Sequence, residues 1–372
     1  METYIKEAGF ILFSVCFIIQ LYFLLIKQTK LYAFKPDNNL PAASVPVSVI
    51  ISARNEVKNL SENLPFIMQQ DYPDFEVIVV NDSSTDLSDV ILLEFKETYT
   101  NLKIVTITDG DRYGTGKKFA LTLGIKAAKN EHLLFTDADC KPVSQNWITR
   151  MAANFSNGVN IVLGYSPYKK AKKFVNPFIR FETIKTAINY FSAALRGNAY
   201  MGVGRNLAYT KTLFFSKKGF ASHMHILSGD DDIFVNQNAT PSNTAIETHP
   251  ETFMYSIAKT SFSSWLRQKK RHFGAGRVYK GKHRFMLVSD ALSGLFFYIS
   301  FTLCLLLNFL PLVAAGMFVF RLIIQIFIYS RLFTRFEGRR LLFYLPFFDV
   351  CYYIFLNIFG LTGAVSKPVQ WK

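Results

Sequence analysis

The chain has 372 residues, of which 50% are hydrophobic and 16% aromatic, and this aromatic share is high for a soluble protein. Its formal net charge of +15 suits nucleic acid, anionic lipid or phosphorylated substrates. The basic clusters lie beside apolar segments and no nucleic-acid-binding motif accompanies them. We therefore expect membrane lipids and phosphorylated substrates as partners, and no nucleic acid.

Residues 1–35 are expected to form an N-terminal transmembrane anchor. Phe10–Ile26 is long enough to span a bilayer, and Gln20 is its only strongly polar side chain. Basic side chains follow the apolar stretch, at Lys27, Lys30 and Lys35. Because no small-residue cleavage site is present, we expect an uncleaved anchor with its N-terminus outside, rather than a signal peptide. Residues 36–45 then form a linker.

Residues 46–276 begin with an alternation of strand and helix patterns. The expected strands are Val47–Ser52, Phe75–Val80, Leu102–Ile107 and Leu133–Thr136. The expected helices are Glu56–Gln70, Leu87–Lys96 and Lys117–Lys129. Such alternation predicts the α/β class, with a mainly parallel sheet covered by helices on both faces.

Polar residues follow each of the four strands, at Arg54–Glu56, Asn81–Asp86, Asp109–Asp111, and Asp137 with Asp139. Open α/β sheets bind ligands at the carboxyl ends of their strands, so these residues predict a nucleotide-type site. On extended backbone, Asp137 and Asp139 point to the same side. Two such carboxylates suit Mg²⁺ or Mn²⁺ held jointly with substrate phosphates. The alternative is a solvated turn.

Three stretches resemble family 2 glycosyltransferases, whose domain has the nucleotide-sugar-binding A-type fold. They are Val47–Glu56, Val80–Asp86 and Thr136–Asp139, and they occur in the family's order and spacing. The resemblance implies that Asp82 contacts the base of the nucleotide, and that Asp137 and Asp139 hold the metal and the diphosphate.

A further stretch, Gly116–Leu121, matches the family's Gly-Lys-x-x-Ala-Leu element. This match implies a nucleotide contact for Lys117, although a solvated lysine at a helix start remains the alternative. The nucleotide-binding residues expected from the resemblance are Ala53, Asn55, Glu56, Asp82, Lys117 and Asp137.

Residues 174–196 carry apolar side chains at helical spacing, directly after the basic run Lys169–Lys173. This pattern predicts either a helix lying at the membrane surface or an ordinary core helix. The glycine pair Gly202 and Gly204 follows and allows close backbone approach to a substrate. It resembles a family segment that lines the acceptor side.

Gly229 precedes a second acidic cluster, Asp230, Asp231 and Asp232. Three adjacent carboxylates repel one another, and a carboxylate with a raised pKa suits a general base for an acceptor hydroxyl. The cluster resembles a motif of hyaluronan- and cellulose-synthase-like enzymes. By register Asp231 matches the catalytic base, with Asp230 as the second choice, and a solvated acidic loop is the alternative.

Gln268 and Arg271 resemble the Gln-x-x-Arg-Trp motif of the same enzymes, with His272 in the place of the tryptophan. The resemblance implies that Arg271 neutralises the leaving diphosphate. Histidine stacks on a sugar less well than tryptophan, which leaves the acceptor type and processivity open. A basic juxtamembrane stretch that binds anionic lipid is the alternative.

Residues 277–372 are expected to form a membrane region with three spans, Ala291–Leu310, Leu312–Ser330 and Leu341–Leu361. Arginines between the last two spans indicate a cytoplasmic side, which places the catalytic domain in the cytoplasm. Arg321 and Asp349 fall inside predicted spans, where each needs a partner. We expect a bacterial inner membrane as the location of a protein with this architecture.

These features together predict a membrane-anchored inverting glycosyltransferase. We expect it to move a hexosyl or N-acetylhexosaminyl group from a nucleotide-diphosphate sugar, first of all a UDP-sugar, to a lipid, lipid-linked or glycan acceptor. The alternatives are a processive polysaccharide synthase with export and a non-catalytic membrane scaffold that keeps the fold. The sequence does not identify the sugar, the acceptor or a protein partner.

Overall fold

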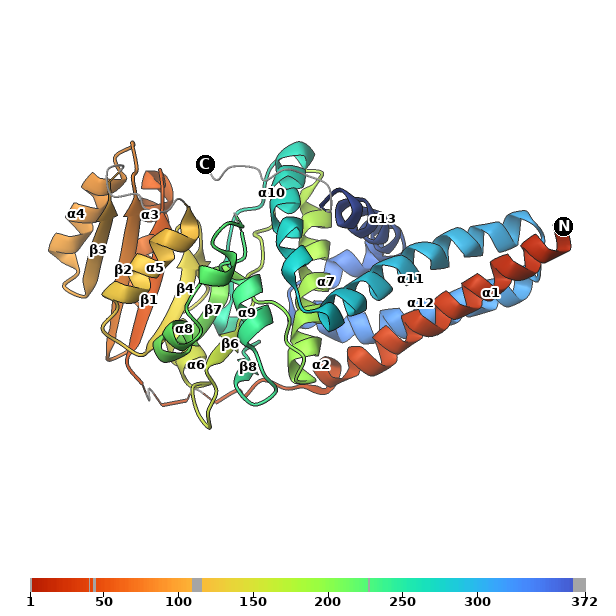
Figure 1. The fold of residues 1–372 in the computed structure, drawn as a ribbon, viewed down its shortest axis with the longest axis horizontal. Helices are drawn as coiled ribbons and strands as arrows, with labels where there is room; N and C mark the ends of the chain where they lie inside the picture. The colour runs from red at the N-terminus through yellow and green to blue at the C-terminus, as the bar shows by residue number, and fades with distance from the viewer. Residues whose placement is uncertain (1, 40, 43–44, 109–115, 227, 364–372) are drawn as a thin grey trace.

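The structure is a computed structural model that describes residues 2–39, 41–42, 45–108, 116–226 and 228–363. The layered sheet domain lies at one end, and the long helices α1 (Glu2–Leu21), α11 (Gly281–Leu306) and α12 (Pro311–Arg335) extend away from it (Figure 1). The polar group expected at Asp109–Asp111 lies outside the described residues.

The central sheet has seven strands in the order β3-β2-β1-β4-β7-β6-β8. Strands β1 to β4 pair in parallel, whereas β7 runs antiparallel to both of its neighbours. The strands span Val47–Ala53 (β1), Phe75–Asp82 (β2), Leu102–Ile107 (β3), His132–Asp137 (β4), Ile161–Leu163 (β6), Leu207–Thr210 (β7) and Thr244–Ile246 (β8). The predicted α/β class with a mainly parallel sheet is confirmed.

Helices cover both faces of the sheet because buried side chains alternate along its strands. In β1, Val49 and Ile51 belong to one hydrophobic core and Ile50 to the other. The first core is completed by α3 (Val57–Met68), α4 (Ser88–Thr98) and α6 (Trp147–Ala152). The second is completed by α5 (Lys117–Ala127), α7 (Asn176–Leu195) and α9 (Asp232–Asn238).

The shorter elements complete the domain around this sheet. The two-stranded sheet of β5 (Lys141–Pro142) and β9 (Met254–Tyr255) follows the end of β4, and α8 (Lys211–Ser216) follows β7. Helix α10 (Phe262–Ala275) lies beside α7 and α13 (Leu345–Gly363) (Figure 1). It is held there by Trp265, which stacks on Phe355, and by an ion pair of 2.6 Å between Lys269 and Glu182.

Four helices of the described chain are long and apolar enough to cross a membrane: Thr3–Ala33, Gly281–Leu306, Pro311–Arg335 and Arg339–Gly360. They correspond to the four predicted spans, with shifted ends. The first includes a π-helical segment, η1 (Tyr22–Lys27), before α2 (Thr29–Ala33). The turn between the second and third of these helices contains Asn308 and Leu310, both with left-handed backbone (φ +49° and +46°).

A buried ionic cluster joins the membrane helices to one another and to α7. Asp349 of α13 accepts hydrogen bonds from Lys185 (2.6 Å), Arg321 (3.0 Å) and the Tyr298 hydroxyl (2.7 Å). Arg321 also donates to Gln20 of α1 at 2.8 Å. Lys185, Arg321 and Asp349 are each at most 2% exposed. The two charged residues expected to need partners inside the spans are therefore partners of each other.

Helix α7 is buried around most of its circumference, from Ile179 to Ala194. Its apolar residues from Phe181 to Ala194 belong to the large core that also contains side chains of α12 and α13. This burial agrees with the core-helix alternative, and a position of the helix at the membrane surface stays a prediction. Every residue of the basic run Lys169–Lys173 before it is exposed, and contact of this run with lipid stays a prediction.

Candidate active site

The loops that follow β1 and β2 are fastened together at the carboxyl edge of the sheet. Asn55 has a left-handed backbone (φ +56°), which asparagine tolerates well. Its N–H donates to the Ser84 hydroxyl at 2.9 Å, and its side-chain oxygen accepts from the Thr85 N–H at 2.7 Å. The Glu56 N–H donates to Ser88 at 3.0 Å. The first of these loops carries Asn55 and Glu56, two of the six residues expected to bind the nucleotide.

The strand register brings the other expected nucleotide-binding residues to the same edge. Ala53 of β1 pairs with Asn81 of β2, and Ser52 pairs with Asp137 of β4. Ala53 and Asp82 are both buried, at 1% and 3% exposure. Their contact with a nucleotide stays a prediction.

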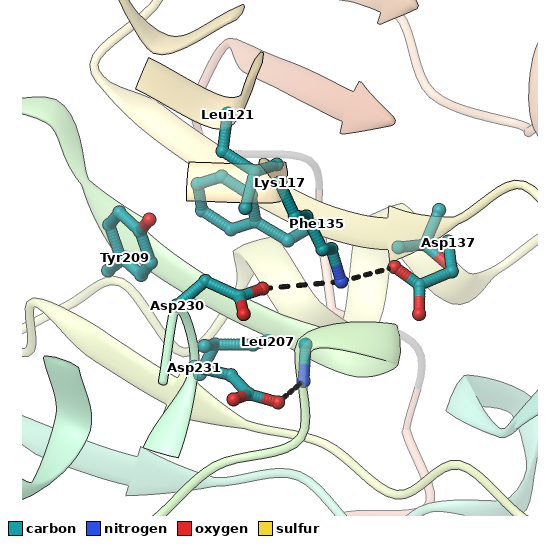
Figure 2. Close-up of a pocket in the computed structure, with 10 residues that line it drawn as sticks. Lys117, Leu121, Phe135, Asp137, Leu207, Tyr209, Asp230 and Asp231 are labelled. Atoms are coloured by element: carbon teal, nitrogen blue, oxygen red, sulfur yellow. Dashed lines mark hydrogen bonds and ion pairs between the residues drawn. The ribbon is translucent and has the colours of Figure 1, made fainter. Parts of the chain in front are cut away.

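Lys117 joins the two acidic clusters across the pocket shown in Figure 2. Its ammonium lies 2.7 Å from an oxygen of Asp137 and 3.2 Å from an oxygen of Asp230. Burial alone would lower the pKa of Lys117, but the attraction of Asp137 and then of Asp230 outweighs burial and raises it. The side chain is only 21% exposed, so the alternative of a solvated lysine at a helix start is wrong.

The pocket has an apolar wall and a charged side (Figure 2). Leu121, Phe135, Leu207 and Tyr209 form the wall. The other lining residues are Lys117, Thr136, Asp137, Gly204, Asp230 and Asp231. The pocket encloses about 250 Å³, including space open to solvent. Residues from β4, α5, β7 and the start of α9 are thus brought into one site.

Asp231 is the residue before α9 and has the properties of a base. Its carboxylate accepts hydrogen bonds of 2.7 Å from the backbone N–H of Gly204 and from that of Asp232. Burial and the negative charge of Asp230 raise the pKa of Asp231 to about 6, against the lowering effect of Lys117. At neutral pH the carboxylate is ionised, yet it is more basic than an ordinary aspartate.

Asp230 differs from Asp231 because it touches Lys117 directly. Burial raises the pKa of Asp230, but the charge of Lys117 outweighs burial and lowers it below the usual value. A carboxylate held ionised by a lysine is a weaker proton acceptor. The geometry therefore favours Asp231 as the base, as the register of the motif does.

Asp232, the third acid, is buried and accepts a hydrogen bond of 2.7 Å from the Tyr279 hydroxyl. Burial and the charge of Asp231 raise the pKa of Asp232 to about 8, so this carboxyl is mostly protonated at neutral pH. Protonation relieves the repulsion among the three acids. The cluster is shielded and hydrogen-bonded, so the alternative of a solvated acidic loop is wrong.

Asp137 and Asp139 have a donor set that fits Mg²⁺ or Mn²⁺. Asp139 accepts a hydrogen bond of 3.0 Å from Ser256. Burial raises the pKa of Glu56, and the negative charges of Asp139 and Asp137 raise it further. These two charges therefore act on a third carboxyl group at the same edge of the sheet. The described residues contain no group of three His, Cys, Asp or Glu arranged to hold a metal. Two carboxylates with other positions left for phosphate oxygens are typical of Mg²⁺ sites.

Arg205 is a nearby cation that the sequence did not single out. Its guanidinium lies 4.3 Å from the centre of the Tyr168 ring and donates to the Ser166 carbonyl at 3.2 Å. Burial lowers the pKa of Arg205, but Tyr168 and the acidic residues Asp139 and Asp137 keep it above its usual range. In the sequence, Arg205 is marked only by its position directly after the glycine pair Gly202 and Gly204.

The structure does not bring Gln268 and Arg271 into the pocket. Both side chains are partly exposed, and Arg271 has no ion pair among the described residues. The backbone carbonyl of Arg271 accepts a hydrogen bond of 3.0 Å from Ser228, which lies in the loop before Asp230. The side chain of His272 lies outside what the structure describes. A direct role for this motif stays a prediction.

Comparison with known proteins agrees with the resemblance of the sheet domain to family 2 glycosyltransferases that the sequence motifs indicated. Residues 48–217 match the family model for glycosyl transferase family 2. Glycosyltransferase AglE of Haloferax volcanii is 36% identical over 121 residues, which cover 32% of this chain and 38% of that protein. The 4,4′-diaponeurosporenoate glycosyltransferase of Staphylococcus aureus is 29% identical over 188 residues, which cover 49% of each protein. The matched region thus spans less than half the length of these relatives.

A solved structure has a similar fold over nearly the whole chain. It is the mannosyltransferase PcManGT of Pyrobaculum calidifontis, in complex with GDP-Man and Mn²⁺. The two share a TM-score of 0.64 at 18% sequence identity, over 96% of this chain and 98% of that chain. This likeness confirms the A-type fold with its added helices. Residues 48–217 of the chain are therefore similar to family 2 glycosyl transferase domains.

Proposed function

We propose that the chain is a membrane-anchored inverting glycosyltransferase. It moves a hexosyl or N-acetylhexosaminyl group from a nucleotide-diphosphate sugar, first of all a UDP-sugar, to a lipid, lipid-linked or glycan acceptor at the cytoplasmic face of a bacterial inner membrane. The observation that carries this proposal is the pocket in which Lys117 joins Asp137 to the second acidic cluster, beside the more basic Asp231.

The proposed reaction is a single displacement. Asp231 takes the proton from an acceptor hydroxyl, whose oxygen attacks the anomeric carbon of the donor sugar. The bond from this carbon to the diphosphate oxygen breaks, and the nucleoside diphosphate leaves with its electron pair. Lys117 places a positive charge beside Asp137, where the diphosphate is expected. A divalent cation held by Asp139 and Asp137 would supply further stabilisation of the leaving group.

The comparisons support a nucleotide-sugar donor and a divalent cation. PcManGT was solved with GDP-Man and Mn²⁺, and the Staphylococcus aureus relative is named a 4,4′-diaponeurosporenoate glycosyltransferase. A processive polysaccharide synthase with export is the second candidate function, although the four candidate spans found among the described residues are few for an export channel. A non-catalytic scaffold is disfavoured by the joining of both acidic clusters in one pocket.

Donor turnover tests the proposal directly. Purified protein in detergent is offered UDP- and GDP-sugars with Mn²⁺ or Mg²⁺ and membrane lipid, and release of the nucleoside diphosphate is measured. We expect release from one donor, abolished by EDTA and lowered about 10²-fold or more by Asp139→Ala, because charge on the leaving group is then left unbalanced. Asp89→Ala, which changes an exposed carboxylate of α4, is the matched control.

Two results would count against this function. Absence of both donor turnover and metal-dependent nucleotide binding, with lipid present, would favour the scaffold. A transferred sugar that retains its anomeric configuration would exclude the single displacement.

The pH dependence of turnover reports on the base. Since Asp231 must be ionised to accept a proton, kcat/KM is expected to fall as pH decreases through about 6. Asp230→Asn removes a negative charge that raises the pKa of Asp231, so the acid limb is expected to move to lower pH. A pH–rate profile of both proteins measures the shift. An acid limb that stays in place or moves to higher pH would contradict the assignment.

A further inference from the structure

A second pocket lies where the sheet domain meets the membrane helices. It is formed by η1, the end of α7 and the first turns of α11, and it encloses about 430 Å³ including space open to the outside. Its lining combines apolar side chains such as Phe23 and Leu287 with polar and basic ones. One wall is the π-helical segment, a geometry that is frequent at functional sites.

Two buried polar groups that line this pocket lack a hydrogen-bond partner among the described residues. They are the side-chain oxygen of Gln28, a residue 5% exposed, and the hydroxyl of Ser192, a residue 2% exposed. The amide nitrogen of Gln28 donates to Asn189 at 3.3 Å and to Tyr329 at 3.5 Å. Burying a polar group without a partner is costly. The pocket thus offers hydrogen-bonding groups that a ligand would satisfy.

The pocket also carries more positive than negative charge. Lys27 and Arg196 both line it, and the Arg196 Nε donates to the backbone carbonyl of Lys27 at 3.1 Å, which fixes the guanidinium against the end of η1. Asp290 is the lining carboxylate, and it already accepts hydrogen bonds from Gln20 (3.5 Å) and Tyr353 (3.3 Å). An arginine beside a lysine suits a phosphate group.

Exposed apolar side chains flank the pocket on both of its membrane helices. On η1, Leu25 and Ile26 are 42% and 49% exposed, and on α11, Phe285 and Val288 are 78% and 53% exposed. Both segments belong to candidate membrane spans. A ligand with a phosphate in the pocket would therefore have apolar surface for hydrocarbon chains immediately outside it.

We propose that this pocket binds the headgroup of an anionic membrane phospholipid that carries free hydroxyls. Lys27 and Arg196 pair with the phosphate, and the side-chain oxygen of Gln28 accepts a hydrogen bond from a headgroup hydroxyl. The Ser192 hydroxyl forms a further hydrogen bond with the headgroup. The acyl chains lie along the exposed apolar side chains of η1 and α11. The site is separate from the catalytic pocket, and the proposal does not rest on the transfer reaction.

Native mass spectrometry of the delipidated full-length protein in detergent tests the proposal. Phosphatidylglycerol, diacylglycerol and inorganic phosphate are the three probes. We expect one phosphatidylglycerol per chain, at least tenfold weaker binding of diacylglycerol, and no competition by inorganic phosphate at the same concentration. The double variant Lys27→Gln/Arg196→Gln is expected to bind phosphatidylglycerol at least tenfold more weakly.

The matched control is Lys282→Gln/Arg284→Gln, which removes two exposed basic residues at the start of α11 and should bind as the unchanged protein does. Ser192→Ala removes only an unpartnered hydroxyl, so it should keep the fold and still weaken binding severalfold. Equal binding of diacylglycerol, displacement by inorganic phosphate, or unchanged binding in both Ser192→Ala and the pocket double variant would overturn the proposal.

Discussion

Asp231→Asn is expected to lower the rate of sugar transfer by about 10²- to 10⁴-fold, the usual contribution of a general base. Asparagine has the size of aspartate, and its side-chain oxygen still accepts the hydrogen bond from the Gly204 N–H. It cannot take up a proton. Donor binding should survive, because Lys117, Asp137 and Asp139 are unchanged. Transfer to an acceptor and binding of the nucleotide, measured on the same preparation, separate the two effects.

Asp232→Asn is the matched control for this change. Because the pKa of Asp232 is about 8, its carboxyl is already mostly neutral at pH 7, and an amide reproduces its size and charge. Its rate should stay close to that of the unchanged protein. Full activity of Asp231→Asn, or an equal loss in both variants, would remove Asp231 from the mechanism.

Asp349→Asn is expected to destabilise the protein by about 3–5 kcal/mol, the cost of removing one partner from a buried ion pair. Asp349 pairs with both Lys185 and Arg321, and all three side chains are at most 2% exposed. The amide keeps the shape but leaves the two cations without their shared anion. Unfolding of the full-length protein in detergent, followed with increasing denaturant, measures the loss.

Charge balance can be restored in the same background. Asp349→Asn combined with Lys185→Met removes one cation together with the anion, and it should recover part of the lost stability in a double-mutant cycle. Glu62→Gln, which changes a carboxylate 55% exposed, is the control and should stay within about 0.5 kcal/mol. Equal stability of Asp349→Asn and Glu62→Gln would show that the buried cluster contributes nothing.

The parallel half of the sheet was predictable because its signals are local. Leu133–Thr136 is a short apolar run that ends in acids, and the three strands before it are separated by amphipathic helices. The strand ends then meet by the geometry of parallel sheets alone. The order of the edge strands was not predictable, because β7 inserts antiparallel beside β4 and is only four residues long.

The contacts between the two acidic clusters could not be predicted from the sequence either, because they join distant parts of the chain. The sequence singled out Lys117, Asp137 and Asp231, but only the packing of α5 and α9 against one sheet face brings them together. The choice of Asp231 over Asp230 as the base depended on the position of the Lys117 ammonium group, which contacts Asp230. Likewise, only the fold shows that Lys185 of α7 pairs with Asp349.

Because Lys185 of α7 pairs with Asp349 of α13, the domain border expected at residue 276 is not a place where the chain can be cut cleanly. A water-soluble fragment ending there would keep the lysine and lose its counterion. It would also expose the α7 side chains that pack on α12 and α13. Truncation is therefore expected to yield an aggregating product, and recombinant work on this protein requires the intact chain in a lipid mimetic.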